Sequence, residues 1–423
     1  MCFPNHLLKE QKERIAYMGQ INAGDTAFIL ISAALVCLMT PGLAFFYGGL
    51  VRRKNVLIIM MQNFISMGVV TTIWVIFGFS LAFGNSDGGV IGNFSQYFML
   101  NNVGFLPNPE HGSTIPFLVF FSYQEMFAII TPALITGAFA DRVSFKSYLV
   151  FLVLWSVFVY CPFTHSIWGD GFLYNLGVVD FAGGIVVHVS AGMAALASVI
   201  FVGRRKLRGK EDTEPHNIAF VALGTGLLWF GWFGFNAGSA LAANGIAAHA
   251  FVNTDIAGST AMLTWLFISW ARDGKPSLIG AMTGAVAGLA CITPCAGYVP
   301  SWAAFIIGIS AGVICYLAVM LKVKWKLDDA LDVWGVHGVG GALGAILVGV
   351  FAMKDINGVS GLIEGNLYQF WIQVFAVIIT AIYAFVVTYV ILWVVNKFIK
   401  VRVPEDIEER GLDSSLLGEE AYR

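Results

Sequence analysis

The chain is dominated by long apolar runs that are separated by short polar loops. A helix needs about 20 mostly apolar residues to cross a bilayer, and eleven runs meet this requirement. They cover residues 26–50, 56–84, 115–139, 146–164, 181–203, 217–244, 256–272, 277–296, 299–321, 333–352 and 367–398. The runs therefore predict an all-α integral membrane protein with eleven transmembrane helices. The predicted transmembrane domain covers residues 26–398 and lies in the lipid bilayer.

Charged residues make up 12% of the chain, whereas soluble globular proteins carry about 25%. This deficit excludes a soluble enzyme with a solvated surface, and it excludes a disordered chain. The net charge of −2 leaves no basic surface to hold phosphates, so we expect no nucleic-acid partner. The 47 glycines favour close packing of membrane helices, because small residues let helix backbones approach one another.

The cations alternate between loops as the positive-inside rule requires. Eighteen Lys and Arg residues lie in or beside alternate loops, whereas the intervening loops contain only Lys354. The cationic segments are 52–54, 142–146, 204–210, 272–275, 322–326 and 397–402. We therefore expect a multi-pass protein of the cell membrane with an odd number of spans. Residues 1–25 would lie outside the cell, and a tail of residues 399–423 would lie in the cytoplasm.

The first 17 residues fit this topology poorly. Lys9, Lys12 and Arg14 would have to cross the membrane, and no apolar signal-peptide core precedes Gly24. One interpretation is that the native chain starts at Met18 and that residues 1–17 are a misassigned extension.

Two pairs of similar segments predict an internal repeat. Asp180-Phe-Ala-Gly-Gly-Ile-Val-Val-His188 resembles Asp332-Val-Trp-Gly-Val-His337, and Gly42-Leu-Ala-Phe-Phe-Tyr-Gly-Gly49 resembles Gly231-Trp-Phe-Gly-Phe-Asn-Ala-Gly238. Spans 1–5 and 6–10 would then be two five-helix repeats, and the eleventh helix would be peripheral. Because five is odd, the two repeats would be inverted, which is a transporter architecture. The alternative is that glycine-rich helices resemble one another by chance.

Ionisable residues are costly inside a membrane and usually serve a function there. The residues singled out on this ground are Glu125, His165, Asp180, His188 and His337. The two histidines of the repeat reach the middle of the membrane from opposite sides. A neutral imidazole suits a narrow apolar pore, since it can donate a hydrogen bond at one nitrogen and accept one at the other. The simpler alternative is that each histidine is a helix–helix hydrogen-bond partner.

A metal or haem site is the rival interpretation of these residues. Each of the two helices offers one histidine, and a zinc ion needs three or four ligands. Cys291 and Cys295 are spaced as neighbours on a helix, but no histidine is near them in sequence, and buried cysteine usually behaves as a small hydrophobe. We therefore expect no metal and no cofactor. The loops contain no Walker, dinucleotide-binding or metalloprotease motif, so we do not expect an enzyme.

Aromatic residues form a second group near the outer ends and middles of the spans. They are Tyr123, Phe127, Trp168, Trp232 and Phe235. Ring faces attract cations by about 0.5–2 kcal/mol each. An interfacial aromatic belt is the alternative; it explains Trp168, but it explains the phenylalanines less well because they have no polar atom.

With these motifs the chain resembles the ammonium transporter family (Amt/MEP/Rh) over roughly residues 20–423. The resemblance rests on the segment 180–188, on Gly231–Ser239, on Val336–Gly341, on Thr293-Pro294, and on the tail motifs that begin at Arg402, Gly411 and Gly418. The bacterial and archaeal Amt branch fits better than the Rh branch, because of the span count and the tail.

The resemblance implies a homotrimer with one pore in each subunit. Trp168 and Ser239 would match the outer site that recruits ammonium, with Asp180 supporting it. Tyr123 belongs to the same region and stands where many bacterial members have phenylalanine. The implied gate consists of Phe127 and Phe235, and the implied pore and proton relay of His188 and His337.

The implied function is ammonium transport, with methylammonium as a substrate analogue. Ammonium would be deprotonated near the outer site, and ammonia would cross the apolar pore while the histidines relay the proton. A membrane ammonium sensor of the same fold is the alternative, although the tail contains no added signalling domain. The resemblance also implies that the tail docks on neighbouring subunits and that a P-II-type signalling protein can plug the cytoplasmic side.

Overall fold

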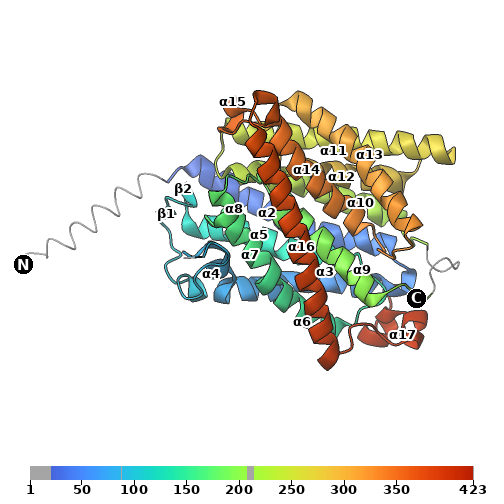
Figure 1. The fold of residues 1–423 in the computed structure, drawn as a ribbon. Coiled ribbons are helices and arrows are strands. Elements are labelled where there is room, and N and C mark those ends of the chain that lie inside the picture. Colours follow the sequence, from blue (N-terminus) through green and yellow to red (C-terminus); the bar gives the residue numbers. More distant parts are fainter. Residues whose placement is uncertain (1–20, 87, 207–213, 423) are drawn as a thin grey trace, which may run out of the picture.

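The computed structural model describes residues 21–86, 88–206 and 214–422. Over these ranges the chain forms a bundle of long helices, with a small two-stranded sheet at one end (Figure 1). The predicted all-α membrane architecture is confirmed. The interpretation that residues 1–17 are an extension before Met18 concerns residues outside the described ranges.

Nine helical stretches of the described residues are long and apolar enough to cross a membrane. They are α2 (Ala23–Leu50); Arg53–Phe83, with α3 (Val56–Ile73) and α4 (Phe79–Phe83); α5 (Phe117–Ile135); Phe145–Asn175, with α6 (Phe145–Trp155), α7 (Cys161–Trp168) and α8 (Phe172–Asn175); Gly184–Val202, with α9 (Ser190–Val202); Ile218–Ala240, with α10 (Ile218–Ala237); α13 (Ser301–Lys324); Trp334–Phe351, with α14 (Val339–Phe351); and α16 (Leu367–Phe398).

Two further helices occupy the remaining predicted spans. Helix α11 (Gly245–Asp273) is long but carries several polar residues, and α12 (Leu278–Ile292) has only 15 residues. Their positions match the predicted seventh and eighth spans, and the total of eleven transmembrane helices stays a prediction. Two short helices complete the fold, α15 (Lys354–Asn357) and α17 (Glu405–Arg410).

Polar residues in the loops fix where several helices begin. The Asn22 side chain accepts a hydrogen bond from the backbone N–H of Asp25 at the start of α2, and Asn244 and Asn366 cap α11 and α16 in the same way. Asparagine is favoured at this position because its oxygen satisfies a backbone N–H that has no partner within the helix.

Glycine brings the two halves of the bundle together. Helices α2 and α10, the first helices of the two predicted repeats, have an extensive contact. At Gly224 of α10 a Cβ atom would lie 2.3 Å from the backbone nitrogen of Phe46 in α2. The expected role of small residues in close helix packing is therefore confirmed at this contact.

The last long helix, α16, runs across the outside of the bundle (Figure 1) and packs mainly on α9 and α14. In the most apolar 18 residues of this helix, only 33% are buried inside the protein, which is the lowest share among the nine stretches. This agrees with the predicted peripheral position of the last helix.

A short hairpin lies at the end of the bundle that carries the starts of α2 and α5. Strand β1 (Pro107–Asn108) pairs antiparallel with β2 (Gly112–Pro116), with Pro107 opposite Pro116 and an irregularity between Pro107 and Asn108. The sequence prediction treated this segment as loop, because such short strands leave no alternating pattern to recognise.

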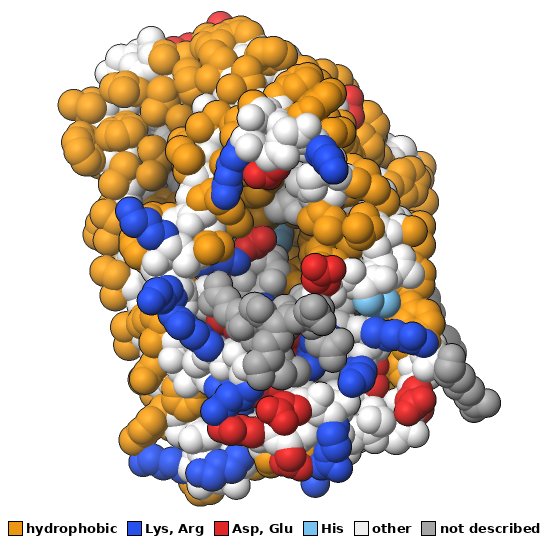
Figure 2. Space-filling view, turned by 90° about the vertical axis from the view of Figure 1, so that its right-hand side faces the viewer, with side chains coloured by type: hydrophobic (Ala, Val, Ile, Leu, Met, Phe, Trp, Pro, Cys, Tyr) orange, Lys and Arg blue, Asp and Glu red, His pale blue; other side chains and the backbone are white. Residues whose placement is uncertain are grey.

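Charged side chains gather at the opposite end of the molecule, and apolar side chains flank them (Figure 2). The tail docks there on its own chain. The Arg402–Glu408 ion pair of 2.8 Å lies within the tail, and Glu408 also accepts a hydrogen bond of 2.7 Å from the backbone N–H of Lys206. The Asp413 carboxylate accepts hydrogen bonds from the backbone of Leu57 and Ile58. The described part of the tail is therefore packed against the membrane domain.

Candidate transport pathway

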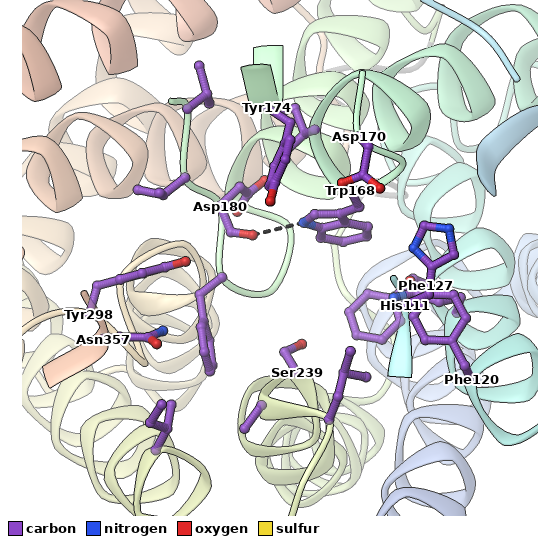
Figure 3. Close-up of a pocket in the computed structure, with 18 of the residues that line it drawn as sticks. His111, Phe120, Phe127, Trp168, Asp170, Tyr174, Asp180, Ser239, Tyr298 and Asn357 are labelled. Atoms are coloured by element: carbon purple, nitrogen blue, oxygen red, sulfur yellow. Dashed lines mark hydrogen bonds between the residues drawn. The ribbon is translucent and has the colours of Figure 1, made fainter. Parts of the chain in front are cut away.

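The end of the bundle that carries the hairpin contains a cavity of about 320 Å³, whose wall includes Phe127, Trp168, Asp180 and Ser239 (Figure 3). We call it the outer cavity, because the predicted topology places this end outside the cell. The indole Nε1 of Trp168 donates a hydrogen bond of 2.8 Å to the backbone carbonyl of Asp180. This bond ties the end of α7 to the loop that precedes the next helical stretch. Ser239 faces them from the end of α10, so the structure brings three of the predicted recruitment residues into one cavity.

The Asp180 carboxylate faces the backbone and organises it. Its Oδ1 accepts hydrogen bonds from Gly183 and Gly184, at 2.9 and 2.6 Å, and its Oδ2 accepts from Ile185 and Val186, at 2.8 and 3.0 Å. These N–H groups open the π-helical segment Gly184–Val189. One carboxylate thus accepts hydrogen bonds from the free backbone N–H groups at the start of the segment that carries His188. Its negative charge is also stabilised by the positive end of the helix dipole.

Tyr123 is buried beside this cavity. Its hydroxyl lies 2.8 Å from the carbonyl oxygen of Phe235, 3.0 Å from that of Gly234 and 3.2 Å from the Ser239 Oγ. The Ser239 hydroxyl itself donates to the Phe235 carbonyl, at 2.9 Å. Tyr123 therefore helps to fix the orientation of the Ser239 hydroxyl.

Two phenylalanines close the floor of the outer cavity. The ring centroids of Phe127 and Phe235 lie 4.3 Å apart, and each side chain is only 1% exposed. The Trp168 ring meets Phe127 edge to face, with centroids 5.7 Å apart. The predicted gate pair is thus in direct contact, immediately below the recruitment residues.

Below the phenylalanines lies a second, much smaller cavity of about 10 Å³, lined by Phe235, Trp232, His188 and His337 together with aliphatic side chains. A volume of this size holds roughly one water molecule. A third cavity of about 10 Å³ follows, and it shares Phe46 and His337 with the second. The three cavities lie in series along a narrow and mainly apolar route.

The two predicted pore histidines meet in this route. The Nδ1 atoms of His188 and His337 are 3.2 Å apart, and the two rings are nearly parallel, at 16°. Both residues lie in π-helical segments, Gly184–Val189 and Trp334–Gly338, and such segments are often found at functional sites. The Nε2 atom of His188 is buried, with no hydrogen-bond partner among the described residues.

Glycines allow this approach of the two segments. A Cβ atom at Gly192 would lie 2.1 Å from the Cα of Gly338, and one at Gly341 would lie 2.6 Å from the Cβ of His188. No side chain fits at these points without moving a histidine segment.

One residue of the pathway escaped the sequence comparison of the repeats, which aligned Asp180 with Asp332. In the structure the counterpart of Asp180 is Asp329, whose Oδ2 accepts a hydrogen bond of 2.8 Å from the backbone of Trp334. Asp332 instead pairs with Lys322. The sequence did contain a signal for this pairing, namely the spacing between the aspartate and the histidine. Asp329 precedes His337 by as many residues as Asp180 precedes His188.

Two other predicted intramembrane residues lie away from the cavities described above. Glu125 is buried on α5. The Nδ1 atom of His165 forms a hydrogen bond of 3.1 Å with the carbonyl oxygen of Ala82. The cysteine pair also has a packing role: Cys291 and Cys295 are buried, and the Cys295 thiol lies 3.1 Å from the carbonyl oxygen of Gly344. These contacts favour the simpler, structural interpretation of all four residues.

A model of the Ammonium Transporter Family matches residues 27–422. The chain belongs to this family. It is 45% identical to an ammonium transporter of Bacillus subtilis, with 95% of this chain and 98% of the relative covered. It is 44% identical to the ammonium transporter Amt1 of Archaeoglobus fulgidus, with 94% and 99% covered. The family resemblance inferred from the motifs is therefore confirmed. The relatives of this chain include bacterial and archaeal proteins.

Solved structures of ammonium transporter family members share the fold. The crystal structure of Saccharomyces cerevisiae Mep2 aligns with a TM-score of 0.86 at 35% identity, covering 92% of this chain and 89% of Mep2. A protein described as a sensor Amt protein aligns with the same score at 29% identity, covering 93% of this chain and 98% of that one.

Proposed function

We propose that this protein transports ammonium across the cell membrane and is not an enzyme. The observation that carries the proposal is the series of cavities, which leads from Trp168 and Ser239 past the contacting phenylalanines to the histidine pair. The family and the names of the relatives, which are ammonium transporters, support the same substrate.

Ammonium would be recruited in the outer cavity, where aromatic faces and oxygen acceptors lie together. Ring faces attract any small cation. The Ser239 hydroxyl, which donates to the Phe235 carbonyl and contacts the Tyr123 hydroxyl, keeps a lone pair for an N–H donor. Ammonium can donate hydrogen bonds and potassium cannot, so this arrangement favours ammonium over an ion of nearly the same size.

Beyond the phenylalanine gate the substrate would travel as neutral ammonia. The inner cavities are narrow and mostly apolar, and an unpaired cation is costly in such surroundings. Deprotonation near the outer site removes this cost. The hydrogen-bonded histidines would guide the ammonia, and they offer a relay for the separated proton.

The outer cavity would face the outside of the cell. Lys and Arg side chains gather at the opposite end (Figure 2), which supports a cytoplasmic tail of residues 399–423 under the positive-inside rule. Residues 1–25 would then be extracellular, and residues 26–398 would form the membrane domain with two inverted repeats.

The resemblance to the family supports a homotrimer with one pathway in each subunit. The docked tail, with its Arg402–Glu408 ion pair, would connect neighbouring subunits, and a P-II-type signalling protein would bind at the cytoplasmic face. These partners are inferred from the family resemblance.

The decisive experiment reconstitutes the purified protein in liposomes and measures uptake of labelled methylammonium. We expect saturable uptake that unlabelled ammonium suppresses and that an equal concentration of potassium leaves unchanged. Empty liposomes are the first control, and a Trp168→Ala/Ser239→Ala variant is the second. Uptake no faster than in empty liposomes would refute the proposal.

A membrane ammonium sensor is the second candidate, because a sensor Amt protein shares the fold over almost its full length. The same liposomes separate the two functions. A sensor would bind ammonium in a calorimeter and yet give no flux above the empty vesicles.

A further inference from the structure

A histidine and two carboxylates meet in the wall of the outer cavity, and none of the three is assigned a role in transport. Glu110 and His111 lie in the turn between β1 and β2, and Asp170 lies between α7 and α8. Their ligand-type atoms all lie within 4.8 Å of one another, and all three residues line the cavity. Figure 3 places the His111 imidazole and the Asp170 carboxylate along the same edge, across the cavity from Ser239 and Tyr298.

His111 is held rigidly in this position. Its side chain is only 7% exposed, and its ring stacks on Phe120 and Phe117, with interplanar angles of 12° and 13°. In the neutral imidazole one ring nitrogen carries a hydrogen and the other keeps a lone pair that can bind a cation.

The three groups do not satisfy one another. Within the described ranges, no hydrogen bond or ion pair within 4.0 Å joins His111, Glu110 and Asp170. Zinc binds nitrogen and oxygen ligands at about 2.0–2.2 Å in a tetrahedral arrangement, so the ligand atoms around one ion lie about 3.5 Å apart. The three groups, within 4.8 Å of one another, would close by small rotations of the exposed Glu110 and Asp170 side chains to surround one cation.

We propose that Glu110, His111 and Asp170 bind a divalent transition-metal cation such as Zn²⁺. One imidazole and two carboxylates are a donor set that suits Zn²⁺ and its neighbours better than Ca²⁺, which prefers oxygen ligands only. The two carboxylates balance the charge of the ion. Both are exposed, so water completes the coordination shell.

Such an ion would regulate access to the pathway. It would join the β1–β2 hairpin to the loop between α7 and α8, and it would neutralise two carboxylates in the cavity that contains Trp168 and Asp180. Opposite charges attract in a partly enclosed cavity, so losing these two negative charges would weaken ammonium recruitment. This consequence rests on the proposed transport function, whereas metal binding itself does not.

The binding test is calorimetric titration of the purified, tag-free protein in detergent with Zn²⁺ alone. We expect one Zn²⁺ per chain, and we expect affinity at least about tenfold lower in His111→Gln and Asp170→Asn, because even second-shell changes cost 10–100-fold. Asp355→Asn, an exposed carboxylate on α15, and His216→Gln at the opposite end are matched controls that keep the wild-type affinity. Co²⁺ titration, followed by visible absorption, provides a second readout.

Two results would overturn the site: wild-type protein that binds no Zn²⁺, or equal affinity in all five proteins. Unfolding temperatures without metal distinguish a lost ligand from a misfolded variant, and Glu110→Gln, on an exposed turn, provides a further ligand variant that leaves the core untouched.

The regulatory consequence is tested separately in liposomes. Zn²⁺ outside the vesicles should inhibit methylammonium uptake by the wild type and by Asp355→Asn, and inhibition by His111→Gln should need at least about tenfold more Zn²⁺. Zinc binding without inhibition would overturn the regulatory role. Absence of uptake even without Zn²⁺ would count against the proposed function and leave the calorimetric result intact.

Discussion

The Nδ1 atom of His337 lies 3.2 Å from the Nδ1 atom of His188, so the two imidazoles share one hydrogen bond inside the bundle. One Nδ1 must carry the proton and the other must accept it. In the neutral pair the two Nε2 atoms are then unlike, because one keeps a lone pair and the other carries a hydrogen. The pair therefore offers ammonia one acceptor and one donor along the route. The two roles exchange when the shared proton shifts between the Nδ1 atoms while one Nε2 gains a proton and the other Nε2 releases one.

Replacing both histidines by alanine should abolish selective ammonium uptake while the fold survives. The substitution removes the hydrogen-bonding groups from a cavity that is otherwise apolar, so an ammonia molecule would find no partner there. Methylammonium uptake in liposomes, with and without potassium, measures the effect. His216→Ala, at the end of the bundle that carries the tail, is the control. A double variant that keeps the wild-type rate and still excludes potassium would refute the role of the pair.

Much of this site could be predicted because its chemistry is unusual for its surroundings. His188 and His337 stand out as ionisable groups in long apolar stretches, and their similar flanking residues indicated a repeat. Phe127 and Phe235 carry no such signal, since phenylalanine is common in any membrane helix. Their pairing came from the family resemblance, and the structure gives it a distance of 4.3 Å between ring centroids.

Other features depend on tertiary contacts that no local pattern reports. Helix α11 begins at Gly245, whereas the apolar run suggested a start at residue 256. The difference arises from polar residues such as Asn253, which is fully buried and donates hydrogen bonds to the carbonyl oxygens of Ala296 and Val299. The sequence pattern also did not predict the π-helical segments around the histidines. Nor did it predict the contacts of the tail with the membrane domain of its own chain.

Asp180→Asn and Asp180→Ala should both impair transport and lower stability. The carboxylate accepts four backbone hydrogen bonds. An amide keeps one accepting oxygen and alanine keeps none, and each buried N–H that loses its partner costs about 1–3 kcal/mol. Unfolding temperature in detergent should therefore fall in the order wild type, Asn, Ala. Asp355→Asn is the exposed control, and an Ala variant with wild-type flux and stability would contradict this assignment.

The assignment of Asp329 as the counterpart of Asp180 can be tested against Asp332. Asp329→Ala should reduce methylammonium uptake by folded protein, because the residue is 3% exposed and caps the segment that carries His337. Asp332→Ala should instead lower the unfolding temperature, since it removes an ion pair of the buried Lys322, and uptake should persist. The reverse pattern would restore Asp332 as the counterpart.

An ion pair at the end of the bundle that carries the tail should make stability depend on pH. Burial opposes the Asp328 carboxylate, but hydrogen bonds and charge from Arg205 outweigh it and lower the pKa of Asp328 to about 2. An unfolded aspartate titrates near about 3.9. The stabilisation, about 2–3 kcal/mol, is therefore present above about pH 4 and is lost as the pH falls toward 2.

Unfolding temperatures between pH 5 and pH 2 measure this effect. The wild type should lose stability steeply over the lower part of the range, and Asp328→Asn should show a shallower slope. Asp273→Asn, which removes the exposed pair with Arg272, should keep the wild-type slope. Identical slopes in wild type and Asp328→Asn would show that this pair is not responsible.

Tyr123→Phe should weaken ammonium recruitment without closing the pathway. The variant keeps the ring that meets Phe127 edge to face, at 5.0 Å between centroids, but it removes the hydroxyl 3.2 Å from the Ser239 Oγ. Loss of one such hydrogen bond is worth about 0.5–1.5 kcal/mol, so the apparent KM for methylammonium should rise about two- to tenfold, with the maximal rate nearly unchanged. Tyr174→Phe, in the wall of the same cavity, is the matched control. A fall in maximal rate at constant KM would instead place the Tyr123 hydroxyl in the gate, because only a step after recruitment would then have slowed.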